Sequence, residues 1–383
     1  MRLPRTTTLL AIAGLSFIAA IVVWWCQPTE EEILKRCGLE GSFAVFCEEE
    51  HYKLANEWIS KNGNDFPKWL QKLLANRFKN KIYNLNNAPA LFKPSLDNIA
   101  SALPHIRLNR ASLHMPIGPG ISKALKQQRQ LIEVSVFDQR TASDCREDLG
   151  FLQYQTALEI YRFAGRSDQG KAYSLLQSSH KLEILILHVP GNTTQSVDAW
   201  PKLKTLSLSS DHLNDTCFDS LLHCPELTEL ELYSVELCGR KKPIQLPRKL
   251  TKFSLWTPGQ AGIFLESLAK SCPDLLELSL DCELSGDDCL SLIQFSHLKK
   301  LTVGGEMDVA RCSITWNPEV LLQLKLPASL ETLEFNRIQI PANLLPVLAA
   351  KLAPGRKIRV ICADSGLSAA DFAPWPQLVP NFK

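Results

Sequence analysis

Residues 272–282 read Cys-Pro-Asp-Leu-Leu-Glu-Leu-Ser-Leu-Asp-Cys, and this stretch decides the fold. Leu275, Leu278 and Leu280 stand at the spacing L-x-x-L-x-L. A polar, turn-like segment around Gly286 follows, and then a short apolar run that could form a helix. One strand followed by one helix cannot bury its apolar face alone, so the stretch predicts similar neighbours along the chain.

The same spacing recurs up and down the chain. Its copies begin at Leu103, Leu131, Leu158, Leu182, Leu203, Leu227, Leu250, Leu275, Leu298 and Leu330, with a degraded copy at Ile358. These marker residues lie 28, 27, 24, 21, 24, 23, 25, 23, 32 and 28 residues apart. Most intervals fall within the about 20–29 residues of a leucine-rich repeat. The pattern predicts an α/β solenoid, a horseshoe with a parallel sheet on its concave face.

The predicted repeat domain covers residues 101–365, and residues 366–383 are expected to form a tail with Pro374, Pro376 and Pro380. The weak first and last copies are plausible only as end caps, because a solenoid must cover its exposed apolar ends. Residues 28–100 have helical periodicity and are predicted to form a helical cap at the N-terminal end. A separate helical module that binds a partner is the alternative.

Residues 9–25 are 17 uncharged residues that end in Trp24 and Trp25, which is near the lower limit for a membrane span. A cleaved signal peptide and an uncleaved anchor both fit, but apolar residues continue past the best cleavage position near Ala20. We expect residues 1–27 to be a stub and an anchor. Arg2 and Arg5 precede the run and three glutamates follow it, which places the repeats on the non-cytosolic side of a single-pass protein.

The chain contains twelve cysteines, and the positions of several follow the period of the repeat. This regular spacing explains them better than a set of disulfides does. Four of them lie 14 residues after a marker: Cys145, Cys217, Cys289 and Cys312. Cys224 and Cys272 lie three residues before a marker, and each is followed by proline. We expect small buried side chains at these positions, with Cys37–Cys47 and Cys289–Cys312 as possible disulfides. Free thiols favour a reducing compartment, in conflict with the charge pattern at the N-terminus.

Two sequence motifs resemble the cysteine-containing subclass of leucine-rich repeats. They are Cys-Pro-x-Leu-x-x-Leu-x-Leu, which starts at Cys224 and Cys272, and the tails Leu213-Asn-Asp-Thr-Cys-Phe and Leu284-Ser-Gly-Asp-Asp-Cys-Leu. This subclass is common in F-box proteins, the substrate-recognition subunits of ubiquitin ligases. The resemblance implies the fold over about residues 100–365 and, as an alternative function, a substrate adaptor. Residues 28–100 show no Leu-Pro-led F-box pattern.

Strand alternation turns the third, fifth and seventh positions of each copy onto the concave face. There, Tyr233 and Trp256 should be neighbours, surrounded by charged residues. We predict a partner-binding cluster that consists of Tyr233, Trp256, Asp281, Glu229, Glu231, Glu277 and Lys252. A second, apolar patch should combine Ile160, Ile184 and Ile186.

The composition points away from several functions. A formal net charge of +2 gives no general reason to expect nucleic acid. No catalytic, phosphate-binding or dinucleotide motif is present, and no C-x-x-C or zinc-type spacing, so we expect no catalytic residues, no metal and no cofactor. The sequence therefore predicts a non-catalytic, membrane-anchored protein that binds another protein with a basic or amphipathic surface. The alternatives are the ligase adaptor and an enzyme with an unrecognised site.

Overall fold

The computed structural model describes residues 43–47, 81–86, 103, 108–113, 119–137, 149–164, 174–193, 197–213, 215–233, 245–260, 262–304, 318–336, 338, 340, 343–363 and 366–382. The chain divides into two units, residues 1–128 and 129–383. The expected membrane run, residues 9–25, and the expected cap helices lie outside the described residues. No helix among the residues that are described has the length and apolar character needed to cross a bilayer.

In the first unit, three strands are described: β1 (Phe43–Cys47), β2 (Lys81–Asn86) and β3 (Leu108–Leu113). β1 pairs with β2 in the antiparallel sense, and β2 pairs with β3 in parallel. Helix α6 (Pro119–Leu125) follows. The region in which we expected a helical cap thus contains strands at residues 43–47 and 81–86.

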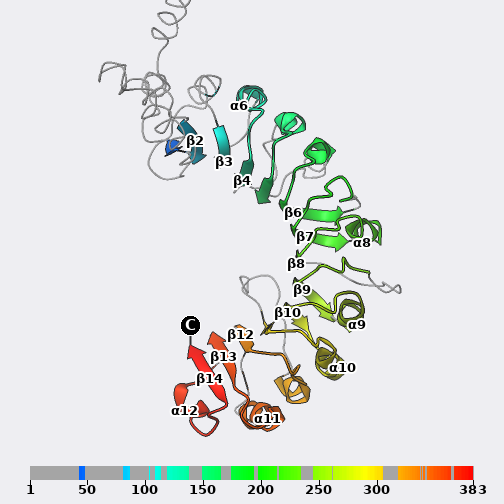
Figure 1. Cartoon of the computed structure of the whole chain (residues 1–383), viewed down its shortest axis with the longest axis vertical. Helices are drawn as coiled ribbons and strands as arrows, with labels where there is room; N and C mark the ends of the chain where they lie inside the picture. The colour runs from blue at the N-terminus through cyan, green and yellow to red at the C-terminus, as the bar shows by residue number, and fades with distance from the viewer. Residues whose placement is uncertain are drawn as a thin grey trace, which may run out of the picture. The chain divides into compact units, whose positions relative to one another are not determined.

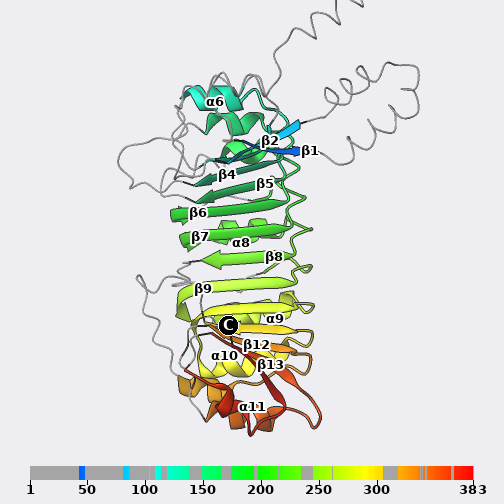
Figure 2. The same ribbon diagram turned by 90° about the vertical axis from the view of Figure 1, so that its left-hand side faces the viewer.

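The second unit is an open parallel sheet in which each strand pairs with the next one in the sequence (Figure 2). Its strands are β4 (Glu133–Phe137), β5 (Ile160–Ala164), β6 (Ile184–Thr193), β7 (Thr205–Leu213), β8 (Glu229–Tyr233), β9 (Lys252–Gln260), β10 (Glu277–Glu283), β11 (Lys300–Val303), β12 (Thr332–Asn336), β13 (Ile358–Ala363) and β14 (Leu378–Phe382). This one-directional order is the arrangement that a leucine-rich-repeat solenoid requires.

Short helices connect most of the strands of this unit and lie on the outer side of its curve, while the strands line the inner side (Figure 1). The helical segments are η3 (Gly150–Tyr154), η4 (Leu176–Ser178), α8 (Asp215–Leu221), α9 (Gly262–Ser271), α10 (Gly286–Ser291), η5 (Leu292–Gln294), η6 (Pro318–Gln323), α11 (Leu344–Lys351) and α12 (Ala369–Phe372). A parallel connection must return the chain to the start of the next strand, and these segments provide that return.

The core lies between the sheet and the helices. The marker leucines from Leu131 to Leu330 are buried, and so are the residues three and five positions after each of them. Phe253 on β9 packs against Phe264 on α9, and Phe264 packs against Phe218 on α8, with ring centroids 5.8 and 5.5 Å apart. The register follows the repeat, since Leu206, Leu230 and Phe253 pair with one another on successive strands. The predicted frame is therefore confirmed over β4 to β12.

The two terminal copies were placed in the wrong register. The strand at the first copy is β3, in which Leu108, Ala111 and Leu113 are buried, so the frame starts at Leu108 and not at Leu103. At the last copy, Val360 and Cys362 pair with Leu333 and Phe335, so the frame starts at Lys357, one residue before the Ile358 at which we placed it.

The segment expected as a C-terminal tail continues the fold. Residues 366–382 contain α12 and β14, and β14 pairs in parallel with β13. Ser368 and Asp371 form a capping box at the start of α12, which satisfies backbone donors that the helix cannot satisfy itself. Pro380 lies in β14 and has no backbone N–H to offer along this edge.

A column of buried hydrogen-bond donors joins successive repeats at the position three residues before four of the markers. Ser179 Oγ donates to Gln155 O at 2.9 Å, and Trp200 Nε1 donates to Leu176 O at 3.0 Å. Cys224 Sγ donates to Val197 O, and Cys272 Sγ donates to Pro247 O, both at 3.4 Å. Each bond reaches back about one repeat, so chemically different side chains perform one structural task.

Candidate partner-binding site

Side chains on the inner face follow the predicted alternation. On β8, Leu230 and Leu232 are buried, while Glu229, Glu231 and Tyr233 are half-buried on the opposite side of the strand. Trp256 on β9 and Asp281 on β10 lie at matching positions of paired strands. The structure therefore brings Tyr233, Trp256 and Asp281 to one end of adjacent strands, as the repeat frame predicts.

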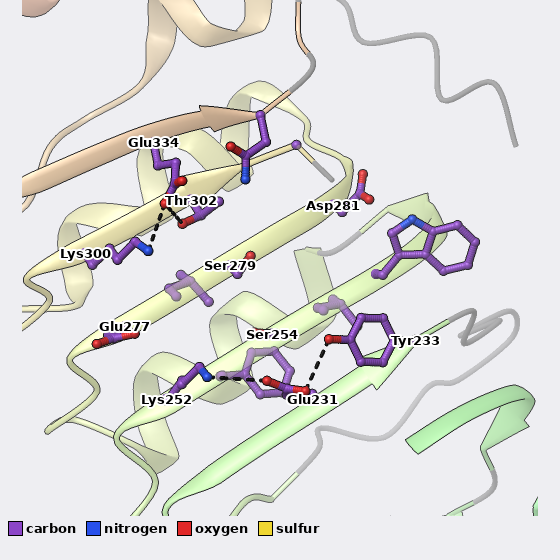
Figure 3. Close-up of a pocket in the computed structure, with 16 residues that line it drawn as sticks. Glu231, Tyr233, Lys252, Ser254, Glu277, Ser279, Asp281, Lys300, Thr302 and Glu334 are labelled. Atoms are coloured by element: carbon purple, nitrogen blue, oxygen red, sulfur yellow. Dashed lines mark hydrogen bonds and ion pairs between the residues drawn. The ribbon is translucent and has the colours of Figure 1, made fainter. Parts of the chain in front are cut away.

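These residues border a hollow of about 310 Å³ on the inner face, formed by β8 to β12 (Figure 3). Its lining residues are Glu231, Tyr233, Lys252, Phe253, Ser254, Leu255, Trp256, Glu277, Leu278, Ser279, Asp281, Lys300, Thr302, Gly304, Glu334 and Asn336. Six of the seven residues of the predicted cluster are in this set. Glu229 is not, although it lies on β8 beside Lys252.

The hollow exists because short side chains occupy the middle of the face. At the fifth position of the repeat, Ser254, Ser279 and Thr302 lie side by side on β9, β10 and β11. Long glutamates, Glu231 on β8 and Glu334 on β12, take the same position on the flanking strands. The row of short residues is thus bounded at both ends by carboxylates.

Two lysines compensate part of the negative charge. Lys252 Nζ lies 3.4 Å from Glu231 Oε1 and 3.8 Å from Glu229 Oε2. Lys300 Nζ lies 2.8 Å from Glu334 Oε2, which also accepts a hydrogen bond from Thr302 Oγ1 at 3.4 Å. The acids that we predicted around the aromatic pair are therefore partly engaged in ion pairs.

The aromatic end of the hollow has its own polar contacts. The Tyr233 hydroxyl donates to Glu231 Oε2 at 3.2 Å, so the ring is held against β8 (Figure 3). The Trp256 side chain donates a hydrogen bond to the Asp281 carboxylate, which lowers the pKa of that group. Burial has the larger, opposite effect and raises the pKa of Asp281 to about 6. This carboxylate is therefore poorly compensated when it is ionised.

The cluster predicted from the sequence left out five residues that line the hollow: Lys300, Glu334, Thr302, Gly304 and Asn336. All of them occupy outward positions of the repeats that begin at Leu298 and Leu330. The repeat frame alone would have placed them beside Glu277 and Asp281, since register pairs Glu277 with Lys300. The cluster was drawn too narrowly because it was chosen around the aromatic residues.

The predicted isoleucine patch is assembled but lies elsewhere on the sheet. Ile160 on β5 pairs with Ile184 on β6, and Ile186 lies opposite Arg162. The three isoleucines are half-buried. Arg162 forms an ion pair with Glu133 of β4 beside them. None of these residues lines the hollow.

Six cysteines of the second unit are buried: Cys217, Cys224, Cys272, Cys282, Cys289 and Cys362. Burial raises the pKa of the Cys224, Cys272 and Cys289 thiols to about 12, so these groups stay protonated and unreactive at neutral pH. The expectation of small buried side chains is confirmed at the described positions. Cys37, Cys145 and Cys312 lie outside the described residues. Within the described part of the chain, no group of His, Cys, Asp and Glu side chains could hold a metal ion.

No protein-family model matches the sequence. Three solved structures are similar to the chain. An internalin from Listeria monocytogenes is 12% identical, with a TM-score of 0.41, over 85% of this chain and 93% of its own. TLR13, from a complex with ssRNA13, is 15% identical, with a TM-score of 0.41, over 79% of this chain and 46% of its own. A chain of the mouse RP105/MD-1 complex is 14% identical, with a TM-score of 0.40, over 68% of this chain and 47% of its own.

Matches at this level carry no functional information, and the fold assignment depends on the parallel register and the buried repeat positions of the chain itself. The second unit is an open parallel sheet of the leucine-rich-repeat solenoid type.

Proposed function

We propose that the protein is a non-catalytic interaction module that binds another protein through the hollow on β8 to β12. The observation that carries this proposal is the convergence of Tyr233, Trp256 and Asp281 at one edge of a row of short polar side chains. Half-buried aromatic residues at a concave surface have the composition of interaction hot spots.

The dimensions favour an extended segment of the partner. Neighbouring strands lie about 4.8 Å apart, so the row from Glu231 to Glu334 spans roughly 19 Å, the length of about six extended residues. The hollow and its rim hold five carboxyl groups and two lysines: Glu229, Glu231, Glu277, Asp281, Glu334, Lys252 and Lys300. This excess of negative charge favours a basic or amphipathic partner.

Site-specific photo-crosslinking tests the location of the contact. A photoreactive amino acid is placed at Ser279, in the row of short residues, and in a control at Glu266, which is exposed on the outer helix α9. We expect a protein adduct in cells from position 279 and not from position 266. Equal adducts from both positions would contradict a specific contact in the hollow.

Truncation of the aromatic pair tests the energetics. Replacing both Tyr233 and Trp256 by alanine should weaken binding of the crosslinked partner by more than about 2 kcal/mol, because truncation of aromatic anchors at a desolvated contact has costs of this size. The matched control replaces Leu290 and Ile293 by alanine. These residues are 37% and 53% exposed in α10 and η5, on the outer side. Unchanged affinity in a folded double variant of Tyr233 and Trp256 would refute the proposal.

We further propose that residues 9–25 anchor the protein in a membrane, with the repeats on the non-cytosolic side. The uncharged run and its basic N-terminal flank support this topology. Protease treatment of sealed vesicles or intact cells, with a tag after Lys383, tests it. A tag that is digested from the non-cytosolic side is the expected result, and a tag digested only from the cytosolic side would refute it.

A ligase adaptor with cytosolic repeats is the second candidate function. The buried free thiols of Cys224, Cys272 and Cys289 favour it, since unpaired cysteines are usual in a reducing compartment. Co-purification with a ubiquitin-ligase scaffold, together with a cytosolic tag, would support this function. An exported repeat domain would exclude it.

A further inference from the structure

The seventh position of the repeat forms a row with an unusual sequence of side chains. On β8 to β11 it holds Tyr233, Trp256, Asp281 and Gly304. Along this row, two aromatic rings come before the Asp281 carboxylate. The next residue of the row, Gly304, has no side chain. Asp281 has Trp256 beside it on β9, and it lines the hollow.

Gly304 is required at its position for two reasons. Its φ of 92° lies in the left-handed region, and a Cβ atom there would come within 2.3 Å of Asn336 O. The backbone N–H of Gly304 donates to Leu280 O at 2.8 Å, which holds the bend close to Asp281. The open side of the Asp281 carboxylate is therefore built into the backbone.

The lysines of the hollow are engaged with other carboxylates. Lys252 pairs with Glu231 and Glu229, and Lys300 pairs with Glu334. Among the described residues, Asp281 has only the hydrogen bond from the Trp256 side chain. A half-buried carboxylate with one neutral donor and an open side gains most from a cation supplied by a ligand.

We propose that Asp281, Trp256 and Tyr233 form a receptor for one cationic side chain, an arginine or a lysine, of the bound partner. The guanidinium or ammonium group donates to the carboxylate and lies against the aromatic rings, where their quadrupoles attract a cation. Arginine fits better than lysine, because a planar guanidinium can stack on a ring and donate to a carboxylate at the same time. This proposal depends on the proposed function, as it names the group that anchors the partner.

The test uses the full chain labelled with 5-fluorotryptophan, at pH 7.5, where Asp281 is ionised. The chain contains eight tryptophans, and the Trp256 fluorine resonance is assigned by its loss in Trp256→Phe. The probes are N-acetyl-arginine amide and N-acetyl-citrulline amide, which have nearly the same shape and differ in charge. We expect a saturable shift of the Trp256 resonance with the arginine probe and none with the citrulline probe.

Two variants distinguish a direct contact with Asp281 from a general attraction of cations by the negative charge around the hollow. Asp281→Asn removes the charge and keeps an oxygen that can accept from Trp256. Asp274→Asn removes the same charge from the same repeat, at an exposed turn position that does not line the hollow. Asp281→Asn should weaken binding of the arginine probe at least about tenfold, and Asp274→Asn less than about twofold, since a general field acts through all nearby charges but a contact acts through one.

Three results would overturn the receptor: equal shifts with both probes, equal weakening in both variants, or no saturable shift with arginine up to about 100 mM, the range of the weakest specific contacts. Any of them, combined with loss of the crosslinked partner in the double alanine variant of Tyr233 and Trp256, would refute the receptor and leave the proposed function intact. If the double alanine variant also keeps its partner, the proposed function fails as well.

Discussion

Trp256 and Asp281 are register partners on the parallel strands β9 and β10, and the Trp256 side chain donates a hydrogen bond to the Asp281 carboxylate. Burial raises the pKa of this carboxylate, and the hydrogen bond from the tryptophan, which lowers it, has the smaller effect. A group of this kind destabilises the isolated protein slightly in its ionised form and favours binding of a cation.

Asp281→Asn should stabilise the isolated protein at neutral pH. The pKa of Asp281 is about 6 in the folded chain, above the ordinary value of 3.8, so the folded state binds this proton more tightly than the unfolded state does. The penalty on the wild type is complete above about pH 7 and vanishes below about pH 4. We expect a gain of about 1 kcal/mol at pH 7.5, after allowance for solvent screening of a half-exposed carboxyl.

Urea unfolding of both proteins between pH 4 and pH 8 measures this difference. The two free energies of unfolding should converge as the pH falls. A difference that does not change with pH would show that the substitution acts through packing and not through ionisation.

Lys300→Met should destabilise the fold through the carboxylate that it leaves behind. The Glu334 side chain is 6% exposed and loses its ion-pair partner at 2.8 Å. We expect a loss of about 1–3 kcal/mol by urea unfolding, and recovery of at least half of it in the double variant Lys300→Met/Glu334→Gln. Lys204→Met is the control, because its pair with Glu183 is solvent-exposed, and it should leave the urea midpoint unchanged. A double variant no more stable than Lys300→Met would contradict this account.

Ser179→Ala and Ser178→Ala form a matched pair for the column of buried donors. Both hydroxyls donate to a backbone carbonyl at 2.9 Å, Ser179 to Gln155 O and Ser178 to Gln153 O. Ser179 is fully buried, while Ser178 is half-buried and its bond is exposed. Ser179→Ala should cost about 1–3 kcal/mol in thermal or urea unfolding, since a buried carbonyl loses its donor, and Ser178→Ala less than about 0.5 kcal/mol. Equal costs would argue against a structural role for the column.

Gly304→Ala and Gly355→Ala separate backbone strain from steric overlap. Both glycines have positive φ, 92° and 79°. A Cβ atom at Gly355 meets nothing within 4 Å, whereas one at Gly304 overlaps Asn336 O and the Ile338 side chain. Gly355→Ala should cost about 1 kcal/mol, from the left-handed conformation alone. Gly304→Ala should cost at least about 3 kcal/mol in the same unfolding assay, because overpacking adds to the strain. Similar losses for the two variants would exclude the overlap as the cause.

The repeat frame could be predicted from sequence because each copy repeats the same burial pattern. From Leu131 to Leu330, leucine, valine or an aromatic residue fills every inward position, and the observed register follows. The first copy failed because Leu103-x-x-Ile106-x-Leu108 matches the pattern better than Leu108-x-x-Ala111-x-Leu113, in which a small alanine occupies an inward position. The last copy failed because Lys357 stands where a marker leucine is expected.

The site was predictable in position but not in charge balance. The period of the repeat shows which residues point outward and which strands are neighbours. These two facts together predict that Tyr233, Trp256 and Asp281 lie side by side. The ion pairs of Lys252 and Lys300 depend on how far long side chains reach diagonally across strands, and the repeat does not specify this. The raised pKa of Asp281 depends on local desolvation, which the period of the repeat does not specify either.

The column of buried donors also indicates where repeats could be exchanged during evolution. At the position of Ser179, Trp200, Cys224 and Cys272, three other repeats carry Pro247, Phe295 and Pro327, whose side chains have no donor. Deletion of a repeat with a donor removes the hydrogen bond that the preceding repeat receives from it. Deletion of the repeat with Phe295 or the repeat with Pro327 breaks no such bond, whereas deletion of the repeat with Pro247 removes the carbonyl to which Cys272 donates. The evolutionary history of this solenoid should therefore show gains and losses of whole repeats at the two joints of Phe295 and Pro327.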